Sequence, residues 1–187
     1  MADEIGRLIA SCDTNTHQGL RDRSIILLLS RLGLRAGDII NMEMGDINWE
    51  ESALRVKGKG RKEVLLPLPQ EVGDALLAYL EKARPIVNID NIFLCLNAPY
   101  RSFPSSSGIS SIVSAALYRA GINNPPSRGA SLLRHSAATN MLRNGATLET
   151  VLAVLRHQSL DMTGYYAKVD FPQLMLITQP WPEGAPC

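Results

Sequence analysis

The chain is organised around three short stretches near its C-terminal end: Ser131-Leu132-Leu133-Arg134-His135-Ser136, Leu155-Arg156-His157 and Met162-Thr163-Gly164-Tyr165-Tyr166-Ala167-Lys168. They set an arginine, an imidazole and a phenol at short intervals. An arginine side chain stays protonated at neutral pH, and a phenol becomes a nucleophile when neighbouring groups assist the loss of its proton. This combination suits the attack of a tyrosine on a phosphodiester. We interpret the preceding chain as the scaffold for these residues.

Two further charged groups lie in the first half of the chain. Arg35 follows Gly33-Leu34 directly after a dense apolar run, and Asp38 comes three residues later. Lys59 lies between two glycines in a predicted hairpin turn, where the exposed backbone lets its side chain reach outward. A surface arginine and a solvated charged turn are the alternatives for these two segments.

These segments together resemble the conserved boxes of the tyrosine recombinases, the phage integrase family. The family pattern has Gly-Leu-Arg followed three residues later by an acid, a hairpin lysine, then His-x-x-Arg, Leu-Gly-His and Thr-x-x-Tyr. The resemblance covers about residues 3–170 and implies these catalytic residues: Arg35, Lys59, Ser131, Arg134, His157 and Tyr166. The candidates for contacts with DNA are Lys57, Arg61, Lys62 and Arg128, whose alternative is a solvated basic surface.

Ser131 is the position at which the chain departs from the family pattern, which has a histidine there. A serine hydroxyl is shorter than an imidazole and does not take up a proton near neutral pH. We therefore expect slower, but not abolished, chemistry. The alternative is that Ser131 caps a helix that begins near Leu132, since serine is a good N-cap.

The resemblance implies a site-specific DNA recombinase or integrase that breaks and rejoins DNA through a 3′-phosphotyrosine intermediate. It implies that the reaction needs no cofactor, metal ion or ATP, and that the partner is double-stranded DNA. A homotetramer is expected on DNA and a monomer without it. Two alternatives remain: a catalytically impaired DNA-binding relative, because of Ser131, and a type IB topoisomerase with related site chemistry.

Composition sets limits on these interpretations. At 187 residues with 45% hydrophobic residues, the chain is long enough for one domain with a sizeable core. The net charge of +1 is low for a protein that neutralises phosphates. The three widely spaced cysteines suggest neither a disulfide framework nor a zinc site. No apolar run is long enough to span a membrane, and the first residues lack the layout of a signal peptide, so we expect a cytoplasmic protein.

The expected fold is α+β, mostly α-helical with a small three-stranded antiparallel sheet, as in the catalytic domain of the tyrosine recombinases. Apolar periodicity and end signals predict helices over residues 3–12, 20–32, 72–84, 109–120, 129–143 and 147–156, and strands over 46–49, 53–56 and 63–66. We further expect Gly33 to stop a helix in a left-handed conformation, Thr147 to be an N-cap, and residues 92–94 to form a short strand.

The domain boundaries follow from the same resemblance. Residues 1–170 are expected to form the catalytic domain, and residues 171–187 a C-terminal tail with a proline-rich end. The apolar residues of that tail are expected to dock on this protomer or on a neighbour, because they are too apolar to remain in water. The separate N-terminal DNA-binding domain that family members usually carry is expected to be absent.

Overall fold

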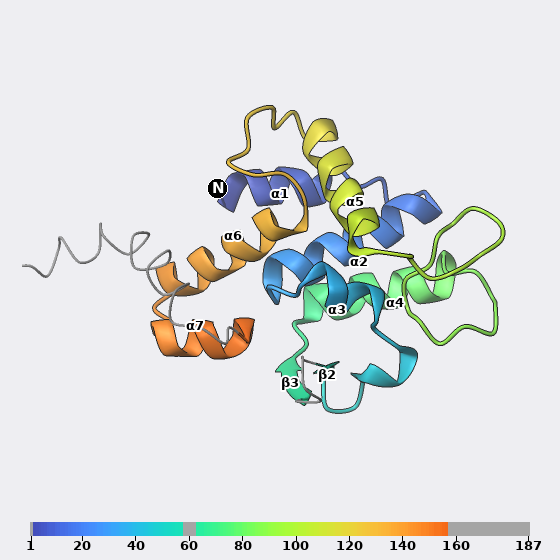
Figure 1. Ribbon diagram of the computed structural model, residues 1–187, viewed down its shortest axis with the longest axis horizontal. Coiled ribbons are helices and arrows are strands. Elements are labelled where there is room, and N and C mark those ends of the chain that lie inside the picture. The colour runs from blue at the N-terminus through green and yellow to red at the C-terminus, as the bar shows by residue number, and fades with distance from the viewer. Residues whose placement is uncertain (1, 58–62, 157–187) are drawn as a thin grey trace, which may run out of the picture.

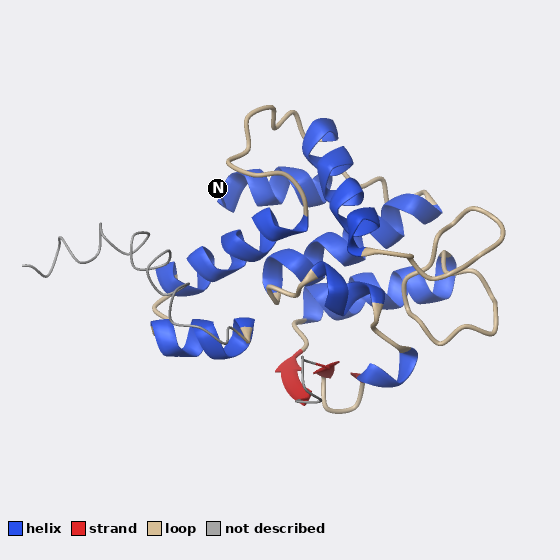
Figure 2. Ribbon diagram, viewed as in Figure 1, coloured by secondary structure: helices blue, strands red, loops and turns tan. Residues whose placement is uncertain are grey.

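The computed structural model describes residues 2–57 and 63–156. The helices are α1 (Ala2–Ala10), α2 (His17–Arg31), α3 (Ala36–Ile40), α4 (Gln70–Lys82), α5 (Ser106–Arg119), α6 (Ala130–Arg143) and α7 (Leu148–Leu155), with a 3₁₀ turn η1 (Met44–Asp46). The strands are β1 (Ile47–Asn48), β2 (Ala53–Lys57) and β3 (Glu63–Pro67). Figures 1 and 2 show these helices gathered into one body with the sheet at its edge. The expected fold class is confirmed.

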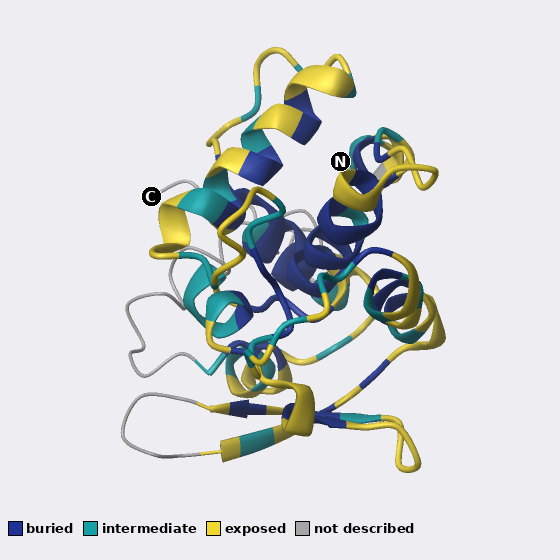
Figure 3. Ribbon diagram, turned by 90° about the vertical axis from the view of Figure 1, so that its right-hand side faces the viewer, coloured by how far each residue is buried: buried dark blue, intermediate teal, exposed yellow. Residues whose placement is uncertain are grey.

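Helix α2 is the centre of the core. Five consecutive apolar residues, 25–29, are completely buried, as expected for a helix that is apolar on all sides. The helix begins where the Thr16 hydroxyl accepts a hydrogen bond from the Gly19 amide (3.0 Å). It packs against α1, α3, α4, α5 and α6, and Figure 3 shows the buried residues concentrated on the inner helices. The other helices are therefore positioned around α2.

The sheet has the order β1-β2-β3, with both pairs antiparallel. Leu54 lies opposite Leu66, and Val56 lies opposite Val64. Leu54 and Val56 are buried while Arg55 between them is exposed, which is the alternation of a sheet with one face on the core. The turn between β2 and β3, with Lys59, lies outside the described residues.

The end of α2 brings the chain against α7. Gly33 has φ +62°, so the expected left-handed stop is confirmed. A Cβ atom at Gly33 would lie 2.5 Å from Leu155 Cδ2, which is buried at the end of α7. At the other end of α7, Thr147 is the N-cap, as expected, and accepts a hydrogen bond from the Thr150 amide (3.2 Å).

The predicted short strand at residues 92–94 is wrong. Ile92, Phe93 and Leu94 are completely buried, but the segment forms only isolated bridges, one before it at Asn91 and one at Leu94. One main-chain hydrogen bond, from the Ile92 amide to the Met42 carbonyl (2.8 Å), and several side chains hold it. Phe93 stacks on Tyr79 with ring centroids 5.4 Å apart, and the Arg84 guanidinium donates to the Ile92 carbonyl (3.1 Å). An apolar run of this length does not by itself distinguish a strand from a buried loop.

In the part of the chain that the structure describes, no helix has the length and apolarity needed to cross a membrane.

Replacing Gly33 by alanine should destabilise the protein. The left-handed conformation costs an L-residue about 1–2 kcal/mol, and the new methyl group would also displace Leu155. We expect Gly33→Ala to lower the free energy of unfolding by about 1–3 kcal/mol, measured by urea denaturation. Gly6→Ala is the matched control, because Gly6 lies in α1 with open space around it; this change should raise stability by about 0.5–1 kcal/mol. Equal effects of the two substitutions would contradict the prediction.

Candidate active site

Arg134 is held in the interior by two main-chain carbonyl groups. It lies on α6 and is 7% exposed. Its guanidinium donates hydrogen bonds to the carbonyl oxygens of Gly33 and Leu155. A buried charge needs such partners, since an uncompensated charge is costly in a protein interior. The left-handed turn after α2 and the end of α7 are therefore both fixed to this side chain.

Arg35 lies at the N-terminus of α3 and is exposed. Its amide donates to Asp38 Oδ2 (2.7 Å), so that Asp38 closes the first turn of the helix. Its guanidinium donates from Nη2 to the main-chain carbonyl oxygen of Arg156 (2.8 Å). Two predicted catalytic arginines, Arg35 and Arg134, thus lie at consecutive carbonyl groups at the end of α7, although they are far apart in the sequence.

Arg156 is a site residue that the sequence analysis did not assign a role. It is the C-cap of α7 and has left-handed backbone angles, φ 54° and ψ 45°. Its guanidinium forms an ion pair with Asp38, and both side chains are 9% exposed. We call Arg35, Asp38, Arg134 and Arg156 the arginine cluster. The signal that could have identified Arg156 is a long charged side chain at the position where the family pattern has glycine.

The end of α7 suits this role for a physical reason. The last carbonyl groups of a helix have no donors within the helix, and they form the negative end of the helix dipole. Those of Leu155 and Arg156 accept from Arg134 and Arg35. The arginine cluster contains three guanidinium groups and one carboxylate, which pairs with Arg156, so the cluster has a positive excess. Guanidinium groups bind phosphate oxygens with matched geometry, so this arrangement can bind a phosphodiester.

Ser131 lies in the first turn of α6 and is exposed. The N-cap of α6 is Gly129, with φ +96° and no capping side chain. The alternative in which Ser131 caps this helix is therefore wrong. Ser131 lies one turn before Arg134 on the same helix, so the two residues are neighbours on the helix surface.

Several predicted residues lie outside the described part of the chain: Lys59, Arg61, Lys62, His157 and Tyr166, and with them the tail 171–187. The two other DNA-contact candidates are described. Arg128 is exposed in the segment before α6. Lys57 Nζ lies 2.5 Å from Glu43 Oε2 and 3.4 Å from Asp46 Oδ1, and the hydrogen bond with Glu43 is the main reason why the pKa of Lys57 is raised. Lys57 is thus paired with acids in this structure.

His135 follows Arg134 on α6. Arg134 is buried, whereas His135 is half-buried. Burial lowers the pKa of its imidazole, and the positive charge of Arg134 lowers it further. Both causes act against the charged form. The neutral imidazole is accordingly favoured at this position.

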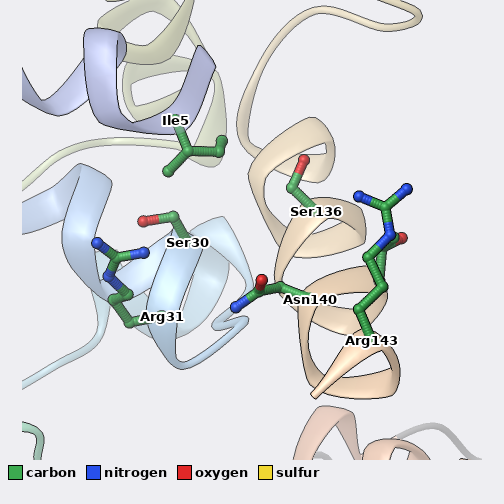
Figure 4. Close-up of a pocket in the computed structure, with 7 residues that line it drawn as sticks. Ile5, Ser30, Arg31, Ser136, Asn140 and Arg143 are labelled. Carbon is green, nitrogen blue, oxygen red and sulfur yellow. The ribbon is translucent and has the colours of Figure 1, made fainter. Parts of the chain in front are cut away.

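A separate pocket of about 50 Å³ lies between α1, α2 and α6. Figure 4 shows its labelled side chains, which come from all three helices. The Ser30 hydroxyl is buried there and has no hydrogen-bond partner among the described residues. None of the lining residues belongs to the predicted site. Among the described residues, no group of three or more His, Cys, Asp or Glu side chains is placed to hold a metal ion.

Comparison with known proteins gives a consistent result. Residues 1–173 match the phage integrase family. The chain is 44% identical over 181 residues to the y4rA protein of Sinorhizobium fredii (strain NBRC 101917 / NGR234), covering 96% of this chain and 44% of that protein. It is 33% identical over 174 residues to the tyrosine recombinase XerC of Staphylococcus carnosus (strain TM300), covering 92% of this chain and 57% of XerC. The chain thus spans about half the length of these relatives.

A solved structure with a similar fold is the crystal structure of XerA recombinase. Its TM-score is 0.80 at 25% identity, covering 97% of this chain and 65% of that one. The sequence match covers most of the chain, and the similarity of fold covers nearly all of it. Both agree with a site whose arginine cluster can bind a phosphodiester. The chain belongs to the phage integrase family, the tyrosine recombinases.

Proposed function

We propose that this chain is the catalytic part of a site-specific DNA recombinase that breaks and rejoins DNA through a 3′-phosphotyrosine on Tyr166. The observation that carries the proposal is the meeting of Arg35 and Arg134 at the end of α7. Membership of the phage integrase family supports it. The substrate is double-stranded DNA, and the active assembly is a tetramer on DNA.

The roles of the side chains follow from the chemistry. Arg35 and Arg134 bind the non-bridging oxygens of the phosphodiester and stabilise the charge of the transition state. The Tyr166 hydroxyl loses its proton to solvent as its oxygen attacks phosphorus, and the bond to the 5′ oxygen breaks. Lys59 donates a proton to that leaving oxygen, and His157 donates a hydrogen bond to the phosphate.

The same residues account for rejoining. The phosphotyrosine keeps the energy of the broken phosphodiester, so a 5′ hydroxyl of a second strand can attack it and release the tyrosine. No nucleotide is consumed in this exchange. The arginines supply electrostatic stabilisation of the kind that metal ions supply in many nucleases, so the proposed reaction runs without a metal ion.

The second candidate function is that of a DNA-binding relative with weak chemistry. The observation that favours it is Ser131, whose short, exposed side chain replaces the histidine of the family pattern. In that case the chain binds its site but forms little covalent complex. Relaxation of supercoiled DNA without strand exchange would instead indicate a topoisomerase.

Covalent capture of DNA should depend on Tyr166. The chain is incubated with a pool of duplexes that carry a nick and randomised flanking sequences, so that the released 5′ end diffuses away and the covalent complex accumulates. Complexes that resist detergent are isolated, and the enriched sequence is used as the substrate. Tyr166→Phe should abolish capture because the nucleophile is lost. Tyr165→Phe is the matched control and should retain it, because the Thr163-x-x-Tyr166 spacing of the family pattern places the nucleophile at residue 166. The reverse result would show that the nucleophile is Tyr165.

Replacing Ser131 by histidine should speed cleavage. Loss of one positioned donor at a transition-state oxygen typically costs about 10²- to 10³-fold in rate, and the exposed position gives the larger ring room. We expect a gain of about 10- to 100-fold in single-turnover cleavage of the selected substrate. Ser127→His is the control, because Ser127 is exposed in the loop before α6. Equal rates for the parent and Ser131→His would show that this position does not limit the chemistry.

A further inference from the structure

Arg156 adopts a backbone conformation that is unusual for its residue type. Its φ of 54° lies in the left-handed region, and among the described residues only Ser52 is another non-glycine residue with positive φ. A bulky side chain is uncommon there because Cβ approaches the following carbonyl group. Glycine, which the family pattern has at this position, would adopt it without strain. Specific contacts must therefore hold Arg156 in this conformation.

The contacts of its side chain and of its carbonyl group lead to Arg35. The side chain of Arg156 forms an ion pair with Asp38, and the Asp38 carboxylate also accepts the hydrogen bond from the Arg35 amide. The main-chain carbonyl of Arg156 accepts from the Arg35 guanidinium. One residue thus holds Arg35 at both ends: at its backbone through Asp38 and at its guanidinium directly. The interactions form a closed ring.

The two catalytic arginines differ in how much they depend on such a ring. Arg134 is buried and held by two carbonyl groups. Arg35 is exposed, so packing restrains its long side chain little. Its described partner at the guanidinium is the carbonyl of Arg156. The conformation of the chain at Arg156 therefore decides where that guanidinium lies.

We propose that Arg156 is a positioning residue, whose ion pair with Asp38 and left-handed backbone hold the Arg35 guanidinium at the place where the phosphodiester binds. This proposal rests on the proposed function, since it concerns the same reaction. Its alternative is that the ion pair only stabilises the fold. Buried ion pairs often contribute little net stability, so the two roles predict different measurements.

The first experiment compares rate with stability. In Arg156→Gly the ion pair is lost, but glycine accommodates the left-handed backbone. We expect the melting temperature to change little, while single-turnover cleavage of the selected nicked duplex falls about 10- to 100-fold, because small misplacements of a catalytic group are costly. The affinity for the same duplex should change less than the rate. Arg143→Ala is the matched control: Arg143 is exposed in the last turn of α6, and its loss also removes one positive charge.

Asp38→Asn isolates the ion pair. The asparagine side chain keeps an oxygen that accepts from the Arg35 amide, but it loses the charge that pairs with Arg156. It should show a rate loss like that of Arg156→Gly. Arg156→Lys keeps the positive charge and should recover part of the rate.

The second experiment asks whether Arg156 acts through Arg35. In an Arg35→Lys background, adding Arg156→Gly should reduce the rate by less than about threefold, because residues that act on one interaction are not additive. A purely structural role would give the full loss in both backgrounds. Full additivity, or a rate loss that merely follows a fall in melting temperature, would overturn the proposal.

A third measurement does not require activity. In the ¹⁵N-labelled chain, rotation of the Arg35 guanidinium about its Cζ–Nε bond should be slow in the parent and faster in Arg156→Gly, as seen by NMR. If the parent captures no DNA, the proposed function fails, and this measurement still tests the positioning. Equal rotation in both proteins would overturn the positioning itself.

Discussion

The structure depends on the burial of one positive charge. The guanidinium of Arg134 lies in the interior, where it would be strongly destabilising without acceptors. Its partners are the carbonyl groups of Gly33 and Leu155, which belong to the end of α2 and the end of α7. These segments approach closely because Gly33 has no side chain. The packing of these two segments and the placement of Arg134, which we propose to be catalytic, therefore depend on the same contacts.

The positive charge of the site is local and not a property of the whole chain. The net charge is only +1, and several described basic residues elsewhere are paired with acids, as Lys57 is with Glu43. In the arginine cluster the basic groups exceed the single acid, Asp38. Main-chain carbonyl groups orient the guanidinium groups of Arg35 and Arg134. These carbonyl groups are dipoles and carry no net charge. The site can therefore be preorganised for an anion without cancelling its charge.

Much of the fold could be predicted from local sequence, and the parts that could not depend on contacts between distant segments. The apolar density of α2 and the alternation in β2 are properties of consecutive residues, as is the stop at Gly33. The conformation of Arg156 is different, because it is held by Asp38, far away in the sequence. The start of α6 also depended on tertiary packing. Gly129 caps this helix with positive φ and lies against Ser110, where a Cβ atom would be 3.0 Å away, although Ser131 had the better capping side chain.

The family pattern His-x-x-Arg places a histidine and an arginine one turn apart, and in this chain Ser131 replaces the histidine while Arg134 is kept. Arg134 is held by the carbonyls of Gly33 and Leu155, so its placement does not require a histidine at position 131. The arginines that we propose to bind the phosphate can thus remain in place in a chain that lacks the histidine. Contacts with phosphates along the DNA backbone contribute mainly to affinity, whereas each group that contacts the reacting phosphate, the arginines and the missing histidine alike, contributes to the rate. We therefore expect a serine at this position to lower the rate of cleavage more than the affinity for DNA.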